Sequence, residues 1–132
     1  GLANSLRCLA YRSRAAAIAE LTAVDALLVT VGSAELKHVT TSKVFDCLAS
    51  GKPLIGIVPP DGELAKLLRS ENETCFSIDD VAGLSSRIRG LIKLRRAGDR
   101  PTLEPQALAA RRDRHSWRAM AQAFAARLDR LT

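Results

Sequence analysis

The sequence predicts an α/β protein in which a short parallel sheet is covered by helices on both faces, with more helices at the C-terminal end. Residues 26–30, 53–58 and 75–78 are apolar segments of strand length, and the second of them, PLIGIV, has no polar alternation, as expected of a strand buried on both faces. Helical patterns separate these segments, and such crossovers favour parallel, right-handed connections. We therefore expect a single domain of 132 residues with a three-layer, Rossmann-like half-domain architecture.

The first part of the chain predicts a helix, a strand and a long loop. Residues 4–22 carry apolar side chains at helical spacing, and Asn4 or Ser5 can cap the start of this helix. After the strand at 26–30, the loop at 31–40 exceeds the usual length of about two to six residues. Ligands of open α/β sheets sit in such loops, at the carboxyl ends of the strands. Small and polar groups suited to ligand contact are Gly32, Ser33, Thr40 and Thr41.

Residues 41–63, TSKVFDCLASGKPLIGIVPPDGE, are the stretch in which we expect a ligand. Thr41 and Ser42 are good N-cap residues, so a helix is expected to begin here with its first amide groups unsatisfied. Such a helix end attracts anions. Gly51 can take the left-handed conformation that follows a helix end. One face of the helix is apolar, and the other is a polar stripe formed by Lys43, Asp46 and Ser50.

The remaining chain predicts helices over 63–70, 81–96, 104–113 and from Ser116 onward. Asp79 or Asp80 can cap the second of these helices. In the last helix Trp117 begins a series of apolar residues at helical spacing, so we expect Trp117 to anchor that helix to the core.

Composition excludes several classes of protein. No apolar run approaches the roughly 18 residues of a membrane span, and the opening residues lack the pattern of a secretory signal. The sequence shows no phosphate-binding glycine loop, no metal-ligand cluster and no Ser/His/Asp set, so neither a metal nor a cofactor is expected. Cys8, Cys47 and Cys75 form no C-x-x-C pair, and we expect reduced thiols in the cytosol.

Positive charge is concentrated in one segment. The chain has 20 Lys and Arg against 14 Asp and Glu, a net charge of +6. Residues 87–100 contain six basic residues against Asp99 alone. A solvated helix face is the plainer explanation. The alternative is a non-catalytic module that binds nucleic acid or an anionic membrane surface through residues 87–100; because the segment has no interleaved aromatic residues and no known recognition motif, we expect no nucleic-acid partner.

The segment SKVFDCLASGKPLIGIVPPDGE, residues 42–63, resembles the C-terminal, nucleotide-sugar donor-binding lobe of GT-B glycosyltransferases. The similarity is greatest to the family 4 type, with its K-[LF]-[FY]-E-Y-[LM]-A-x-G-K-P segment. The flanking sequences VDALLVTVG and HSWRAMAQAFAARL are similar to the preceding strand and the closing helix of that lobe. The resemblance extends from about Ala15 to Leu131, but only the central segment is specific.

The resemblance implies roles for particular residues. The carboxylate that binds the ribose hydroxyls in the family corresponds to Asp46, which is one methylene shorter than the usual glutamate. Thr41, Ser42 and Lys43 correspond to the groups that receive the donor diphosphate. Many members have a glutamate eight residues before the ribose carboxylate, where this chain has His38, so the role of His38 is open.

The resemblance also implies an activity and partners. It implies a retaining, metal-independent glycosyltransferase of the hexosyltransferase type, of which this chain is part of the donor-binding lobe. Because the acceptor lobe is absent, we expect the isolated chain to be inactive. The expected partners are a nucleotide-sugar donor and an unknown acceptor, which is a glycan, a lipid-linked molecule or a small molecule. The expected location is the cytoplasm, with peripheral contact at the inner face of the plasma membrane as a further possibility.

Overall fold

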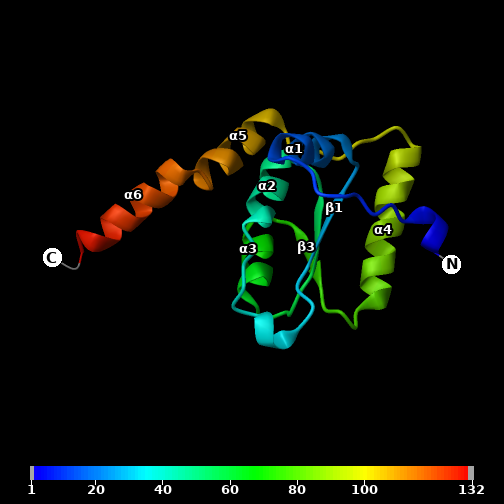
Figure 1. Ribbon diagram of the computed structural model, residues 1–132, viewed down its shortest axis with the longest axis horizontal. Helices are drawn as coiled ribbons and strands as arrows, with labels where there is room; N and C mark the ends of the chain where they lie inside the picture. Colours follow the sequence, from blue (N-terminus) through cyan, green and yellow to red (C-terminus); the bar gives the residue numbers. More distant parts are fainter. Residues whose placement is uncertain (1, 131–132) are drawn as a thin grey trace.

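A sheet of three parallel strands forms the centre of the protein, and the computed structural model describes residues 2–130 (Figure 1). Leu27 pairs with Leu54, and Ile55 pairs with Thr74. The order along the sheet is β1 (Leu27–Thr30), β2 (Leu54–Ile57) and β3 (Thr74–Phe76), so β2 is the middle strand. The predicted parallel sheet of three strands is confirmed.

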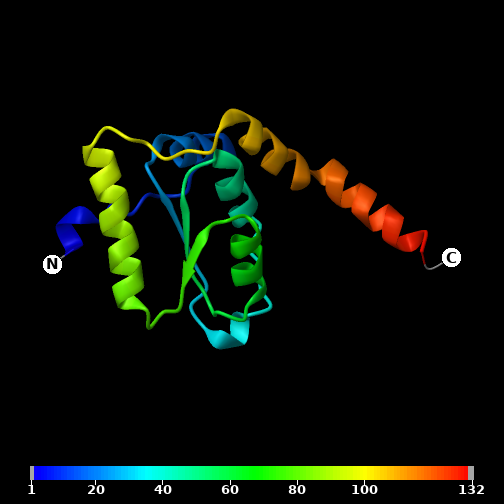
Figure 2. The ribbon, with the colours of Figure 1, turned by 180° about the vertical axis from the view of Figure 1, so that it is seen from behind.

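Helices cover both faces of the sheet, which gives three layers (Figures 1 and 2). The helix α2 (Lys43–Ser50) connects β1 to β2, and α3 (Glu63–Ser70) connects β2 to β3. These two helices lie on one face, and α4 (Val81–Arg96) lies on the other. The loop before α2 contains one short 3-10 helix, η2 (Ala34–Leu36). The architecture is α/β and consistent with a Rossmann-like half domain.

The core lies between β2 and the helices α2 and α3. Ile55 and Gly56 of β2 are also buried, which confirms that the unbroken apolar run marks a strand covered on both faces. Where a Cβ of Gly56 would stand, the side chain of Leu68 packs instead, so α3 approaches the strand at the position that has no side chain. The buried core cluster consists of Val44, Leu48, Leu54, Val58, Leu64, Ala65 and Leu68.

The N-terminal helix is shorter than predicted. The expected helix over residues 4–22 is wrong in its first half, because α1 (Arg14–Ala23) begins only after Ser13, whose Oγ accepts the capping hydrogen bond at 3.3 Å. The predicted caps, Asn4 and Ser5, lie instead in a 3-10 turn, η1 (Leu2–Ser5). Most helical stability in proteins comes from packing an apolar face, and the apolar side chains between η1 and α1 are exposed: Leu6, Leu9 and Tyr11.

The third strand is shorter than predicted. We expected it over residues 75–78, whereas β3 begins one residue earlier and ends at Phe76. The reason is its partner: β2 ends at Ile57, which pairs with Phe76, so no strand remains for Ile78 to pair with.

The last two helices extend from the body of the protein. The first, α5 (Pro105–Arg114), packs on the end of α2, where a Cβ on Gly51 would lie 3.0 Å from a methyl carbon of Leu108. The second, α6 (Trp117–Leu128), projects away from the sheet (Figures 1 and 2), and none of its residues is buried. Because Trp117 is 86% exposed, the prediction that it anchors α6 to the core is wrong. Helical spacing indicated an apolar stripe but not a surface that covers it.

Candidate functional site

The carboxyl ends of the strands open into a small hollow of about 210 Å³. Gly32 and Ser33 line it, together with Asp61 and Asp79 from the segments that follow β2 and β3. Open α/β sheets bind ligands at this position. Lys37 donates a hydrogen bond to Asp61 at 3.2 Å, and this bond lowers the pKa of Asp61. The two carboxylates make the hollow a poor place for a diphosphate, since like charges repel.

The start of α2 differs from the open, anion-binding end that the sequence predicted. The amide of Lys43 donates to Oγ1 of Thr41 at 3.3 Å. The next two amides, of Val44 and Phe45, donate to the carbonyls three residues before them, at 3.1 and 3.2 Å. Ser42 is helical and makes no side-chain capping bond. The prediction of unsatisfied amides is therefore wrong, because tight turns of the 3-10 type satisfy them within the chain.

Asp46 pairs with the start of α1. Nη2 of Arg14 donates to Oδ1 of Asp46 at 3.0 Å, and the Asp46 side chain is 39% exposed. Lys43, three residues before Asp46 on the same helix, forms no ion pair with it among the described residues. Since Oδ2 of Asp46 has no hydrogen-bond partner in residues 2–130, one carboxylate oxygen remains available as an acceptor.

A second hollow, of about 510 Å³, lies beside Asp46 between α2, the start of α1 and the junction of α5 and α6. Ser42 and Asp46 line it from α2. Three arginines, Arg14, Arg111 and Arg112, also line it. Nε of Arg112 donates to the carbonyl of Ala49 at 2.8 Å. The aromatic groups of its wall are Phe45, His115 and Trp117.

These groups suit a planar, anionic ligand that carries hydroxyls. A carboxylate accepts hydrogen bonds from hydroxyls, and guanidinium groups bind phosphate through several donors. The Trp117 ring is exposed and offers a flat face for stacking. The Phe45 and His115 rings pack against each other, with centroids 5.4 Å apart, and close one end of the wall. We call this space the Asp46 hollow.

A buried network of charges holds α5 and the α5–α6 junction beside α2. Glu71, which follows α3, has a side chain only 4% exposed. Arg111 reaches Glu71 at 3.0 Å and Glu73 at 2.7 Å. Arg114 and His115 also contact the Glu71 carboxylate, at 3.1 and 3.0 Å. Because Arg111 and His115 also line the Asp46 hollow, the network positions its C-terminal wall.

Opposing effects set the pKa of Glu71. Burial acts to raise the pKa of this carboxyl, but hydrogen bonds and charges from Arg114 and His115 outweigh burial and hold the pKa below its ordinary value. Glu71 is therefore ionised at neutral pH and compensates the charges of α5.

The other predicted site residues lie outside the Asp46 hollow, and Ser42 borders a further hollow as well. Ser42 also borders a shallow third hollow, of about 640 Å³, with Glu63 and Lys66. The pKa of Glu63 is lowered mainly by its hydrogen bond from Lys66 and in small part by the charge of His38. His38 and Lys43 are exposed. Of the predicted site residues, only Ser42 and Asp46 share the Asp46 hollow.

Sequence reasoning missed several groups of the Asp46 hollow. Arg14 and Arg112 come from the two ends of the chain, and no local pattern marks either as a neighbour of Asp46. Phe45 packs against the core cluster and also lines the hollow, and its apolar character indicates only the first of these places. The Ser-Trp pair at residues 116 and 117 was the one sequence signal for this part of the hollow. Ser116 caps α6, so Trp117 is the first residue of that helix and lies next to the end of α5.

Other kinds of site find little support in residues 2–130. No three His, Cys, Asp or Glu side chains there form a group that could hold a metal ion. None of the helices there combines the length and the apolar character needed to cross a membrane. Cys8, Cys47 and Cys75 are free, and burial, followed by the charge of Asp46, raises the pKa of the Cys47 thiol.

The comparisons with known proteins identify no relative, since no family model, no curated protein and no solved structure matches the chain. The fold and the Asp46 hollow define an α/β domain with a hollow beside its second helix that is lined by aromatic and charged side chains.

Proposed function

We propose that the chain binds a nucleoside-diphosphate sugar as part of the donor-binding lobe of a retaining glycosyltransferase. The observation that supports this best is the composition of the Asp46 hollow. Ser42 and Asp46, to which the sequence resemblance gives donor contacts, share this hollow with three arginines and an exposed tryptophan.

The proposal gives each group one task. Oδ2 of Asp46 accepts hydrogen bonds from the ribose hydroxyls. Arg14, whose side chain is largely exposed, turns from Asp46 toward the diphosphate, and Arg112 holds the second phosphate. Trp117 stacks on the base.

The reaction proposed for such a lobe needs few reactive side chains. Binding positions the sugar, and the arginines stabilise the charge that develops on the leaving diphosphate. The acceptor is held by a different lobe, so the 132-residue chain is expected to bind the donor without transferring its sugar. Turnover by this chain alone would show that the acceptor site lies within it.

Asp46→Ala tests the placement of the ribose. In calorimetric titrations with uridine and guanosine diphosphate, we expect Asp46→Ala to weaken binding by about 1.5 to 3 kcal/mol, the usual contribution of a hydrogen bond to a charged group, which is roughly a ten- to hundredfold change. Asp46→Glu restores the longer side chain of the family and is expected to keep or improve the affinity.

Asp99→Ala is the matched control, because it removes the same charge from the turn after α4, away from the hollow. We expect it to leave the affinity unchanged. Equal affinities for the wild type and Asp46→Ala would mean that Asp46 is a solvated helix residue, and no binding of either diphosphate to the wild type would remove the proposal.

A further inference from the structure

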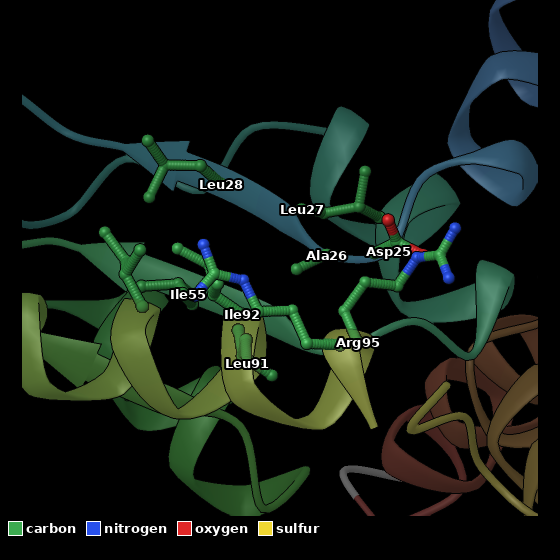
Figure 3. A pocket seen from close by; sticks show the side chains of 10 residues that line it. Asp25, Ala26, Leu27, Leu28, Ile55, Leu91, Ile92 and Arg95 are labelled. Carbon is green, nitrogen blue, oxygen red and sulfur yellow. The ribbon is translucent and has the colours of Figure 1, made fainter. Parts of the chain in front are cut away.

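An apolar groove of about 460 Å³ runs between the sheet and α4, on the face opposite the core (Figure 3). Leu28 of β1 and Ile55 of β2 form one wall, and Leu91 and Ile92 of α4 form the other. The lining side chains of α4 run from Ile88 to Arg96, which corresponds to about 12 Å at 1.5 Å per residue. Leu28, Ile88 and Ile92 are exposed, so α4 does not close the groove.

The wall formed by α4 carries a row of unpaired cations. Arg89, Lys93 and Arg96 follow one another at i, i+4 and i+7, so they lie along one flank of the helix, and Arg96 also lines the groove. All three are exposed, and none forms an ion pair or a side-chain hydrogen bond within residues 2–130.

Charge at the other rim is partly compensated. Asp25, before β1, pairs with Arg95 at 3.0 Å and with Arg100 at 3.9 Å. The groove therefore combines an apolar floor with a flank of cations, from Arg89 to Arg96, that form no ion pairs within residues 2–130, whereas the two arginines at the other rim share one carboxylate.

We propose that this groove binds an acidic amphipathic helix of a partner protein. Apolar side chains at i, i+3 or i+4, and i+7 of such a helix fill the space between Leu28 and Ile92, and carboxylates along one flank face the row from Arg89 to Arg96. Charge complementarity selects the acidic partner, while the apolar floor provides most of the affinity. A second copy of this chain is a poorer fit, because its own exposed helix, α6, is basic.

The shape of the groove favours a helix over a membrane or a nucleic acid. Its apolar side chains face one another across a concavity (Figure 3), whereas a membrane-binding helix presents its apolar face outward to the lipid. Nucleic acid would use the cations but leave the apolar walls exposed.

Fluorescence anisotropy with labelled synthetic peptides tests the proposal. The probe is an amphipathic helix of about 15 residues, with leucines at helical spacing and glutamates along one flank, and the control peptide has lysines in place of the glutamates. We expect the glutamate peptide to bind and the lysine peptide to bind more weakly by about tenfold or more, because like charges then oppose the row.

Two chain variants with matched controls locate the peptide. Ile92→Gln is expected to weaken binding about tenfold or more through loss of an apolar anchor, whereas Ile18→Gln, at a similarly exposed isoleucine of α1, leaves it unchanged. Lys93→Glu is expected to weaken binding, while Arg118→Glu on α6 has no effect. Circular dichroism checks that all four variants fold.

Three outcomes would overturn the proposal. The first is equal binding of the two peptides. The second is peptide binding that Ile92→Gln leaves intact. The third is that the peptide does not bind, whereas phosphatidylserine vesicles or duplex DNA bind and their binding is weakened by Lys93→Glu but not by Ile92→Gln. That result would mean that the row of cations binds an anionic surface.

Discussion

Glu71 places a carboxylate where water barely reaches, and two arginines and a histidine surround it. Arg111 is equally enclosed and shares its guanidinium between Glu71 and Glu73. Breaking such a pair leaves a charge buried without compensation, which costs far more than the net contribution of the intact pair.

Glu71→Gln tests this network. It leaves Glu73 as the one carboxylate against the buried charge of Arg111, so we expect a loss of about 3 kcal/mol in the free energy of unfolding, at the lower end of the range for a broken buried pair, measured by urea denaturation at neutral pH. The wild type should also lose stability in acid. Because the pKa of Glu71 is lowered in the folded protein, its ionised carboxylate stabilises the fold at pH values above the ordinary glutamate pKa. This stabilisation is lost as the pH falls through the folded pKa. The gap between wild type and variant should therefore narrow as the pH falls below the ordinary range of glutamate carboxyls.

Glu104→Gln, at the start of α5, is the control, since its side chain makes no capping bond and is exposed. If Glu71→Gln cost no more than Glu104→Gln, or if the gap did not change with pH, the network would not stabilise α5.

At the scale of the element, α3 and β2 meet at Gly56. Gly56→Ala is expected to lower the free energy of unfolding by about 1 to 3 kcal/mol, because the new methyl group overlaps the side chain of Leu68. In the double variant Gly56→Ala with Leu68→Ala, the overlap disappears, so we expect the combined loss to be smaller than the sum of the two single losses.

Gly90→Ala provides the contrast, since nothing lies within 4 Å of a Cβ at this position on α4. Helix propensity predicts a gain of about 0.5 to 1 kcal/mol there. Additive losses at Gly56 and Leu68 would mean that β2 moves away from α3 and accommodates the methyl group.

The elements that sequence reasoning predicted well are those whose apolar residues meet one another. In α2, β2 and α3 the spacing of Val44, Leu48, Leu54 and Leu64 indicates both the element and its buried side, because these residues form a common core. The helix over residues 4–13 failed, and so did the anchoring role of Trp117, since periodicity marks a face but not the surface that covers it.

The Asp46 hollow shows the same limit. Sequence reasoning placed Asp46 on the polar side of α2 and Ser42 at its start, and the structure brings both into one hollow. Arg14 lies 32 residues before Asp46, and Arg112 bonds a carbonyl 63 residues away, so only tertiary structure brings them together. The closed first turn of α2 escaped prediction because Thr41 and Ser42 suit either an open cap or a tight turn.

At the scale of the molecule, α6 extends from the body without burying any residue. Trp117→Ala is therefore expected to change the free energy of unfolding by less than about 0.5 kcal/mol. Leu48→Ala, in the core, should cost about 2 to 5 kcal/mol in the same measurement.

Trp117 is the single tryptophan, so its fluorescence provides a second measurement. We expect iodide to quench it readily in the folded protein, and a nucleoside diphosphate to protect it if the proposed function is right. A large destabilisation by Trp117→Ala, or emission shielded from iodide without ligand, would show that α6 packs on the body.

The separation of Glu71 from its partners also bears on the order of folding. Arg111, Arg114 and His115 lie 40 to 44 residues after Glu71, so the ribosome releases the three strands and both acids well before the cations that neutralise them. Until the cations are available, Glu71 is more stable in contact with water. The sheet therefore has to form while the surface that α5 later covers is still exposed. Docking of α5 is thus expected as a late step, and its undocking as an early step of unfolding. Since Arg112, His115 and Trp117 belong to α5 and α6, a chain still emerging from the ribosome would have its core before the Asp46 hollow is complete.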